Sequence, residues 1–301
     1  RRRAAVRPAG LLRQARAGKP PRMRAWRSDP PKILPRKAKE CQKAVLELQN
    51  IRKVFNKGTP DENVLFDGFN FSVAEGEFVS IVGSNGSGKT TLLNLISGTM
   101  RPDEGKVLLR GQDITAQKEF VRARRIGRVF QDPAGGMANS MTIAENMAIA
   151  ENKGRAYGLS AALGKKRVEA YREMLHPLGL GLEMRMNVPV GSLSGGQRQL
   201  LTLLVATMTP IDILLLDEHT AALDPKTAEQ TMELTDRIVR EKKITTLMVT
   251  HNLRFAERYG TRLCMFDKGH IVLDAAGEAK AAQKVDDLLA LFNSISIECG
   301  N

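Results

Sequence analysis

Short apolar runs alternate with helix-like patterns over most of the chain. Five runs are aliphatic and rich in β-branched side chains, as expected of buried strands. The segments between them carry apolar residues at helical spacing, for example over residues 91–98. Strands that alternate with helices predict an α/β fold whose parallel sheet is covered on both faces. The predicted strands cover residues 78–82, 211–216, 244–249, 263–266 and 271–273.

Two regions depart from this alternation. Residues 45–55, 69–73 and 107–110 are β-rich and are separated by Gly, Asn and Asp turn signals, which predicts a small β subdomain. Residues 135–200 instead show Met- and Ala-rich helical patterns and a basic loop over residues 153–167. We interpret this middle region as a helical insert.

Three further helices are predicted late in the chain. A helix over residues 198–208 follows two glycines. Another begins after Asp224, which suits an N-cap, with Pro225 at the first helical position. Residues 285–292 predict a short final helix.

The charge of the chain is concentrated at one end. The formal net charge of the 301 residues is +13. Residues 1–43 contain fifteen Lys or Arg and two Asp or Glu, whereas residues 44–301 contain 31 of each sign. The part expected to fold is therefore electroneutral, which argues against a basic nucleic-acid-binding platform, and we expect no nucleic-acid partner.

The basic arm over residues 1–43 is rich in Arg, Pro and Ala and has no sustained periodicity, which predicts disorder. Three interpretations are open. The arm binds anionic lipid or RNA, or it is a targeting presequence, although it has one serine and no amphipathic period. We favour the third, an incidental extension.

Membrane spans and disulfides are not predicted. No stretch approaches the ~20 apolar residues that cross a bilayer, and residues 200–216 are interrupted by Pro210 and Asp212. The three cysteines, Cys41, Cys264 and Cys299, are widely spaced. They indicate neither a disulfide framework nor a metal site, so a reducing compartment is expected.

The most informative motif is a glycine-rich loop between a predicted strand and a predicted helix. It fits G-x-x-x-x-G-K-[ST], in which glycines turn backbone N–H groups toward an anion and the helix N-terminus adds partial positive charge. Lys89 can reach the β- and γ-phosphates of a nucleotide, and the Thr90 hydroxyl can hold Mg²⁺. The loop consists of Gly83, Ser84, Asn85, Gly86, Ser87, Gly88, Lys89 and Thr90.

Two acids end the strand predicted over residues 211–216. A carboxylate at the C-terminal end of a parallel strand lies where α/β sheets bind ligands. Beside a phosphate loop, Asp217 would hold the Mg²⁺ shared with the phosphates. Glu218 would orient or deprotonate the attacking water.

A second glycine motif, Leu193-Ser194-Gly195-Gly196-Gln197, precedes a predicted helix about twenty residues before the acidic strand. Free backbone amides and a helix N-terminus again face outward, which predicts a second phosphate-binding surface. The alternative, a glycine loop that only caps the helix, is less consistent with its position.

Together these motifs resemble the ATPase subunit of ATP-binding cassette (ABC) transporters over roughly residues 45–292. The resemblance implies a P-loop NTPase core with an antiparallel β subdomain and a helical insert, so we expect one ABC ATPase domain over residues 44–295. The motifs stand in family order: residues 83–90, Gln131, residues 193–197, Asp217-Glu218, Ala222-Leu223-Asp224 and His251.

The resemblance implies ATP and Mg²⁺ as cofactors, bound in a head-to-tail homodimer. Each ATP would lie between the phosphate loop of one subunit and Ser194 and Gly196 of the other. Phe55 stands where the family has an aromatic that stacks on adenine, although it also suits a core position on its strand. The implied nucleotide contacts are Phe55, residues 83–90, Thr91, Ser194, Gly195, Gly196 and Gln197.

Family roles follow for the polar residues that end the other strands. Gln131 would sense Mg²⁺ and the water and link the ATP site to a membrane partner. His251 would contact the γ-phosphate and position Glu218. The implied catalytic set is Glu218, His251, Gln131 and Lys89, and the implied metal set is Thr90, Gln131 and Asp217.

One position departs from the family pattern. His219 stands after the glutamate, where most members have proline. Its surroundings are similar to a bacterial subgroup of importers of the tryptophan/tyrosine type. His219 either tunes the pH response of hydrolysis or is a neutral marker of that subgroup, and we favour the marker.

The expected function is ATP hydrolysis that drives a separate transmembrane permease, with import of an amino-acid-like solute. A periplasmic or lipoprotein solute-binding protein would be an indirect partner. The absence of a fused membrane span predicts a stand-alone subunit, and we expect it at the cytoplasmic face of the inner membrane. Two alternatives remain: a soluble ABC ATPase of iron–sulfur cofactor assembly, and a nucleotide switch without hydrolysis, which Glu218 disfavours.

Overall fold

The computed structural model describes residues 43–132, 134–153 and 163–298. The predictions for the basic arm, for Cys41 and Cys299 and for most of the basic loop over residues 153–167 lie outside these ranges. Within them, no helix is both long and apolar enough to cross a membrane.

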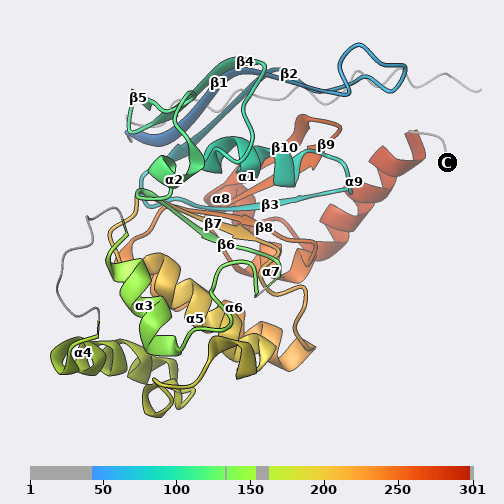
Figure 1. Ribbon diagram of the computed structural model, residues 1–301. Helices are drawn as coiled ribbons and strands as arrows, with labels where there is room; N and C mark the ends of the chain where they lie inside the picture. Colours follow the sequence, from blue (N-terminus) through green and yellow to red (C-terminus); the bar gives the residue numbers. More distant parts are fainter. Residues whose placement is uncertain (1–42, 133, 154–162, 299–301) are drawn as a thin grey trace, which may run out of the picture. The chain divides into compact units, whose positions relative to one another are not determined.

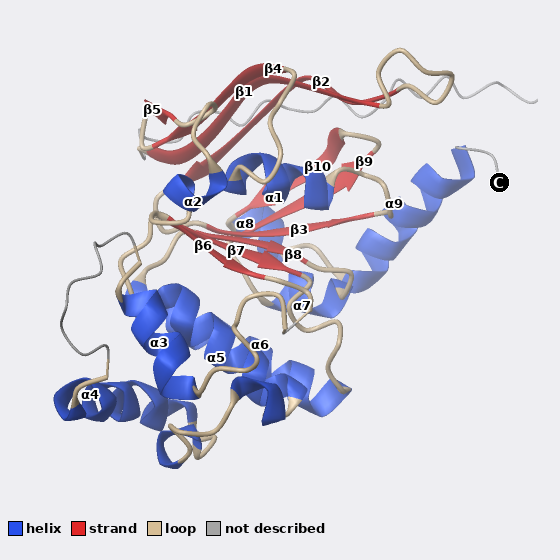
Figure 2. Cartoon of the chain, in the orientation of Figure 1, coloured by secondary structure: helices blue, strands red, loops and turns tan. Residues whose placement is uncertain are grey.

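A six-stranded sheet forms the centre of the domain (Figures 1 and 2). Five of its strands run parallel, and β10 pairs antiparallel with β9 as an edge hairpin. Every residue of β3 and β7 is buried, as expected of strands covered on both faces. The order is β10 (His270–Ala276), β9 (Arg262–Asp267), β3 (Phe78–Gly83), β8 (Thr246–Val249), β7 (Ile213–Asp217) and β6 (Ile126–Val129).

Helices cover both faces of this sheet (Figure 2). On one face α1 (Lys89–Ser97) packs with Leu215 of β7 in one apolar cluster. On the other, Leu214 and Leu216 pack with residues of α5 (Gly195–Thr207) and α6 (Pro225–Lys242). Because side chains alternate along a strand, Asp217 lies on the same face of β7 as Leu215. The remaining core helices are α7 (Leu253–Arg258), α8 (Glu278–Ala281) and α9 (Val285–Glu298).

A second, antiparallel sheet shares the apolar cluster of α1. Leu46 and Phe66 of this sheet are fully buried there. The expected strand over residues 69–73 is longer than predicted, because β2 already begins at Asn63, which the sequence suggested as a turn. The order is β2 (Asn63–Ala74), β1 (Ala44–Phe55), β4 (Glu104–Leu109) and β5 (Gln112–Asp113), and α2 (Glu119–Arg122) follows.

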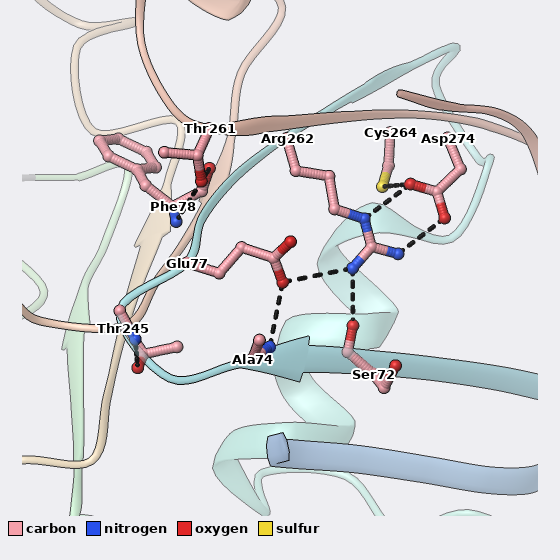
Figure 3. A network of polar contacts seen from close by, with 10 residues as sticks. Ser72, Ala74, Glu77, Phe78, Thr245, Thr261, Arg262, Cys264 and Asp274 are labelled. Carbon is pink, nitrogen blue, oxygen red and sulfur yellow. Dashed lines mark hydrogen bonds and ion pairs between the residues drawn. The ribbon is translucent and has the colours of Figure 1, made fainter. Parts of the chain in front are cut away.

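A buried arginine connects the two sheets (Figure 3). Arg262 of β9 donates to both carboxylate oxygens of Asp274 in β10, at 2.6 and 2.7 Å. It also donates to the backbone carbonyl of Ser72 in β2 at 2.8 Å, and Glu77 lies 3.4 Å away. Arg262 is 4% exposed, so these acceptors replace the water that it loses.

Between β6 and β7 the described elements are helical. α3 (Ile143–Glu151) and α4 (Lys165–Leu175) pack on α5 around a separate apolar cluster, and three short 3₁₀ turns join them, His176–Leu178, Leu182–Met184 and Val190–Ser192. The expectation of a loop up to Arg167 is wrong at its end, because α4 starts at Lys165. Tyr171 of α4 is buried in this cluster, and such tertiary packing outweighs the local basic composition.

Candidate nucleotide-binding site

The glycine-rich loop joins β3 to α1 with the backbone that the motif requires. Gly83, Gly86 and Gly88 have φ of +151°, +78° and +105°, a region that favours glycine. At Gly83 a Cβ atom would lie 2.2 Å from the backbone oxygen of Phe266 in β9. Only glycine therefore lets β3 end so close to its neighbour and turn into the loop.

Lys89 lies over this loop as the first residue of α1. Its ammonium donates to the carbonyls of Gly83 and Ser84, at 2.8 Å each, and the residue is 5% exposed. Burial lowers the pKa of Lys89, whereas the charges of Glu218 and Asp217 raise it. The cation is therefore within electrostatic reach of Asp217, which ends β7, and of Glu218, which follows it.

The hydroxyl of Ser87 is placed where it could bind an anion. Its Oγ is buried and has no hydrogen-bond partner among the described residues. A buried hydroxyl without a hydrogen-bond partner destabilises the folded state unless a ligand forms a hydrogen bond with it. With Lys89 and the glycine backbone beside it, the loop fits the phosphates of a nucleotide.

The polar residues that follow four neighbouring strands meet at one edge of the sheet. The loop follows β3, His251 follows β8, Glu218 follows β7 and Gln131 follows β6. These strands are adjacent and parallel, so their carboxyl ends lie side by side. The structure therefore places Lys89, Gln131, Asp217, Glu218 and His251 at one edge of the sheet.

Glu218 and His251 form the closest polar contact at this edge. His251 Nε2 donates to Glu218 Oε1 at 2.7 Å. Glu218 has φ of +47°, an uncommon backbone conformation for a residue other than glycine. The glutamate side chain is 14% exposed and that of His251 is 46% exposed, so the pair still reaches solvent. A glutamate held in this way can orient a water molecule or accept its proton.

Asp217 is held by a residue that the sequence reasoning missed. Arg128 of β6 donates from Nη2 to Asp217 Oδ2 at 2.9 Å. Arg128 lies three residues before Gln131, and its position on the neighbouring strand was the available signal. The carboxylate that would hold Mg²⁺ therefore already has one cationic partner.

The second glycine motif forms the start of α5 itself, which corrects the prediction that the helix begins at Arg198. Ser194 is the N-cap, and a capping box joins it to Gln197. Gly195 and Gly196 thus occupy the first turn, where backbone N–H groups have no partner within the helix. A Cβ on Gly196 would lie 2.3 Å from Cγ2 of Thr227 in α6, so close helix packing requires this glycine.

Ser194 does not line the same cavity as Glu218 and His251. It lines a cavity of about 730 Å³ together with Gly196, Gln197 and residues of α6. Glu218 and His251 line a different one of about 550 Å³, together with residues that follow β7 and β8 and with Ala228 and Glu229 of α6. The lining of the first cavity includes no residue of the phosphate loop. Ser194 thus lines a cavity apart from the phosphate loop.

The remaining predicted contact residues are accessible. Phe55 ends β1 partly exposed, with Lys53 Nζ 5.7 Å from its ring centroid, so it is not a fully buried core residue. Thr90 and Gln131 are exposed, and Thr91 is partly buried. All four side chains are positioned where a ligand can reach them.

His219 points away from this surface. It is 2% exposed, and its Nε2 lies 3.3 Å from Thr235 Oγ1 in α6. Burial lowers the pKa of His219 to about 4, so the imidazole is neutral at pH 7. A charge change of His219 near neutral pH is therefore not expected, which disfavours the tuning hypothesis.

Comparisons with known proteins agree with this geometry. A family model described as ABC transporter matches residues 66–221, slightly more than half of the chain. The chain belongs to the ABC transporter family. Its residues are 44% identical over 248 positions to a tyrosine transport ATP-binding protein of Clostridioides difficile, covering 82% of this chain and 98% of that protein.

Other members of the family are more distant. An energy-coupling factor transporter ATP-binding protein EcfA2 of Halalkalibacterium halodurans is 34% identical, over 78% of this chain and 82% of that protein. The ATP-binding cassette MJ0796, solved as a dimer bound to ADP and Pi, has a TM-score of 0.65 and 30% identity, and covers 77% of this chain and 98% of its own. A nucleotide-free ATP-binding cassette from an ABC transporter has a TM-score of 0.68 and 27% identity. The match covers 86% of this chain and 100% of that chain.

The chain is thus the ATP-binding subunit of an ABC transporter, and the predicted fold is confirmed. It is an ATPase that binds ATP, with Mg²⁺ as the usual companion of the nucleotide. Three strands outside the matched segment, β8, β9 and β10, belong to the same sheet.

Proposed function

We propose that this subunit powers the uptake of an amino-acid-like solute through a separate membrane permease. The observation that carries the proposal is the 44% identity to a tyrosine transport ATP-binding protein over nearly the full length of that relative. The cassette would lie at the cytoplasmic face of the membrane, and a solute-binding protein would deliver the solute on the other side. Since the ATPase subunit does not contact the solute, its identity is not encoded in these residues.

For the chemical step, we propose that Glu218 activates the attacking water and that His251 keeps it in place. The 2.7 Å contact fixes one carboxylate oxygen of Glu218 and leaves the other for water. Lys89 and the backbone of residues 83–90 would bind the phosphates and offset their charge. Mg²⁺, when bound, neutralises the phosphate charge further, and Thr90, Asp217 and Gln131 would hold it.

The complete site would need a second copy of the chain. Ser194 and Gly196 line a cavity separate from that of Glu218 and His251. In a head-to-tail homodimer the first turn of α5 of one subunit would face the phosphate loop of the other. The free amides of this turn and the partial positive charge of the helix would then bind the γ-phosphate.

The proposed mechanism is tested by Glu218→Gln. We expect hydrolysis to fall by about two orders of magnitude or more, because the general base is removed, while ATP binding persists. The variant should also accumulate as an ATP-bound dimer in size-exclusion chromatography. Hydrolysis at the wild-type rate, with no dimer retained by ATP, would contradict the role of Glu218. Glu241→Gln, at an exposed position of α6 that lines neither cavity, is a matched control and should behave as wild type.

The proposed transport role is tested by identifying the proteins that bind this subunit and by measuring uptake. A tagged cassette expressed in its own cells should copurify with a polytopic permease. That complex in proteoliposomes should take up labelled tyrosine or a related amino acid only with ATP. Recovery of soluble partners alone would favour the cofactor-assembly alternative instead.

A further inference from the structure

Arg128 contacts the acid that would hold Mg²⁺, from the neighbouring strand. β6 and β7 are parallel, with Arg128 opposite Leu215 and Val129 opposite Leu216. Asp217 follows Leu215 by two residues and lies on the same face of the sheet. The arginine side chain therefore reaches along this face to the end of β7, where Nη2 donates to Asp217 Oδ2 at 2.9 Å.

The ion pair is shielded from water. The side chain of Arg128 is 11% exposed and that of Asp217 is 12% exposed. Screening by solvent is weak at this depth, so the attraction is stronger than in a surface pair. Two further contacts fix the guanidinium: Nη1 donates to Ser97 Oγ at 3.2 Å, and the group lies 4.6 Å from the ring centroid of Phe130.

The pairing is nevertheless incomplete. One guanidinium nitrogen contacts Asp217, and Nε of Arg128 is buried without a hydrogen-bond partner among the described residues. A bidentate arginine–carboxylate pair would be stronger. Arg128 thus makes one charge-assisted hydrogen bond to Asp217 where a bidentate pair would make two.

We propose that Arg128 is a built-in counterion of Asp217 in the nucleotide-free subunit and gives up this contact when Mg²⁺ binds with the nucleotide. The inference rests on the proposed role of Asp217 in holding Mg²⁺. Two cations beside one buried carboxylate repel each other, so the arginine contact opposes metal binding. Arg128 consequently sets how much Mg²⁺ improves nucleotide binding.

The measurement is the ratio of ADP dissociation constants without and with Mg²⁺, obtained by calorimetry in EDTA or in MgCl₂. ADP avoids hydrolysis, so the readout does not depend on turnover. In Arg128→Gln the ratio should rise about tenfold over wild type, the size of one lost charge-assisted hydrogen bond. Arg125→Gln is a matched control and should leave the ratio unchanged, because Arg125 pairs with Asp212, which precedes β7 at its other end.

A double mutant separates this inference from the role of Asp217. In an Asp217→Asn background, Arg128→Gln should no longer change the ratio, because the shared carboxylate charge is gone. If Asp217→Asn alone leaves the wild-type ratio intact, the proposed metal role of Asp217 fails. If Asp217→Asn lowers the ratio but Arg128→Gln leaves it unchanged or lowers it, only the counterion inference fails.

Ser97→Ala provides a milder test if Arg128→Gln folds poorly. This change removes the Ser97 contact that fixes the guanidinium and keeps both charges of the pair. The ratio should rise about twofold, because the guanidinium loses one of the hydrogen bonds that hold it beside Asp217. A ratio at or below the wild-type value would overturn the proposal.

Discussion

The buried histidine after the proposed catalytic glutamate predicts a specific sensitivity to acid. His219 is 2% exposed. Thr235 Oγ1 donates its proton to the carbonyl of Thr231 at 2.7 Å, so the bond between His219 and Thr235 uses the proton on Nε2. Protonation of the imidazole would place a charge in this apolar environment between the sheet and α6.

The magnitude follows from the pKa of His219, which burial lowers from 6.5 to about 4. Below pH 6.5 the unfolded chain binds a proton at this position that the folded protein does not bind until about pH 4. The free energy of unfolding therefore decreases as the pH falls through this window. A difference of about 2.5 pKa units corresponds to roughly 3 kcal/mol between pH 7 and pH 4.

Urea unfolding of the wild type and of His219→Gln at several pH values measures this effect. Glutamine keeps a hydrogen-bond donor for Thr235 but does not titrate. The contributions of all other titratable groups to the pH dependence are therefore the same in the two proteins and cancel in the difference. The wild type should lose about 3 kcal/mol more than the variant between pH 7 and pH 4. Parallel pH profiles for the two proteins would refute the assignment of a neutral, buried imidazole.

Two further predictions concern the phosphate loop and the core. Gly83→Ala should abolish nucleotide binding. It should also lower the free energy of unfolding by about 2 kcal/mol more than Gly86→Ala does. The reason is that a Cβ at Gly83 would lie 2.2 Å from the backbone oxygen of Phe266, whereas a Cβ at Gly86 would have open space. Equal losses in denaturant unfolding would contradict this. Cys264 is fully buried, and burial raises its pKa, so iodoacetamide should modify it only in denaturant, as peptide mass spectrometry would show. Rapid labelling of the native protein would contradict its position in β9.

The features that could be predicted from the sequence are those determined by residues close together in the chain. The strand before the phosphate loop, the acids at the end of β7 and the N-cap Asp224 could all be predicted, because each depends on neighbours within a few residues. Parallel pairing then brings the loop, Gln131 and His251 to one edge, which follows from strand order rather than from contacts between particular side chains.

Other features depend on contacts between distant residues and could not be predicted. Helix α4 begins within a basic segment because Tyr171 packs into the cluster on α5. Arg128 and Asp217 are 89 residues apart, and their contact requires the adjacent pairing of β6 and β7. The burial of His219 against α6 is likewise a tertiary effect, which its position after a catalytic motif did not reveal.

The shared site is tested most directly by mixing two inactive variants. Lys89→Ala lacks the phosphate-loop cation, and Ser194→Ala lacks the N-cap of the opposite motif. In a mixed head-to-tail dimer, one site keeps both Lys89 and Ser194. We expect the mixture to recover on the order of a quarter of the wild-type ATPase rate, since half of the dimers are mixed and each has one complete site.

A matched control replaces the second partner with a Lys89→Ala/Ser194→Ala chain, which leaves no complete site and should recover no activity. Recovery in the first mixture alone would show that Lys89 and Ser194 act across the interface. Differential tags on the two chains would show whether mixed dimers form. If they form and the first mixture is as inactive as the control, the proposal of a shared site is contradicted.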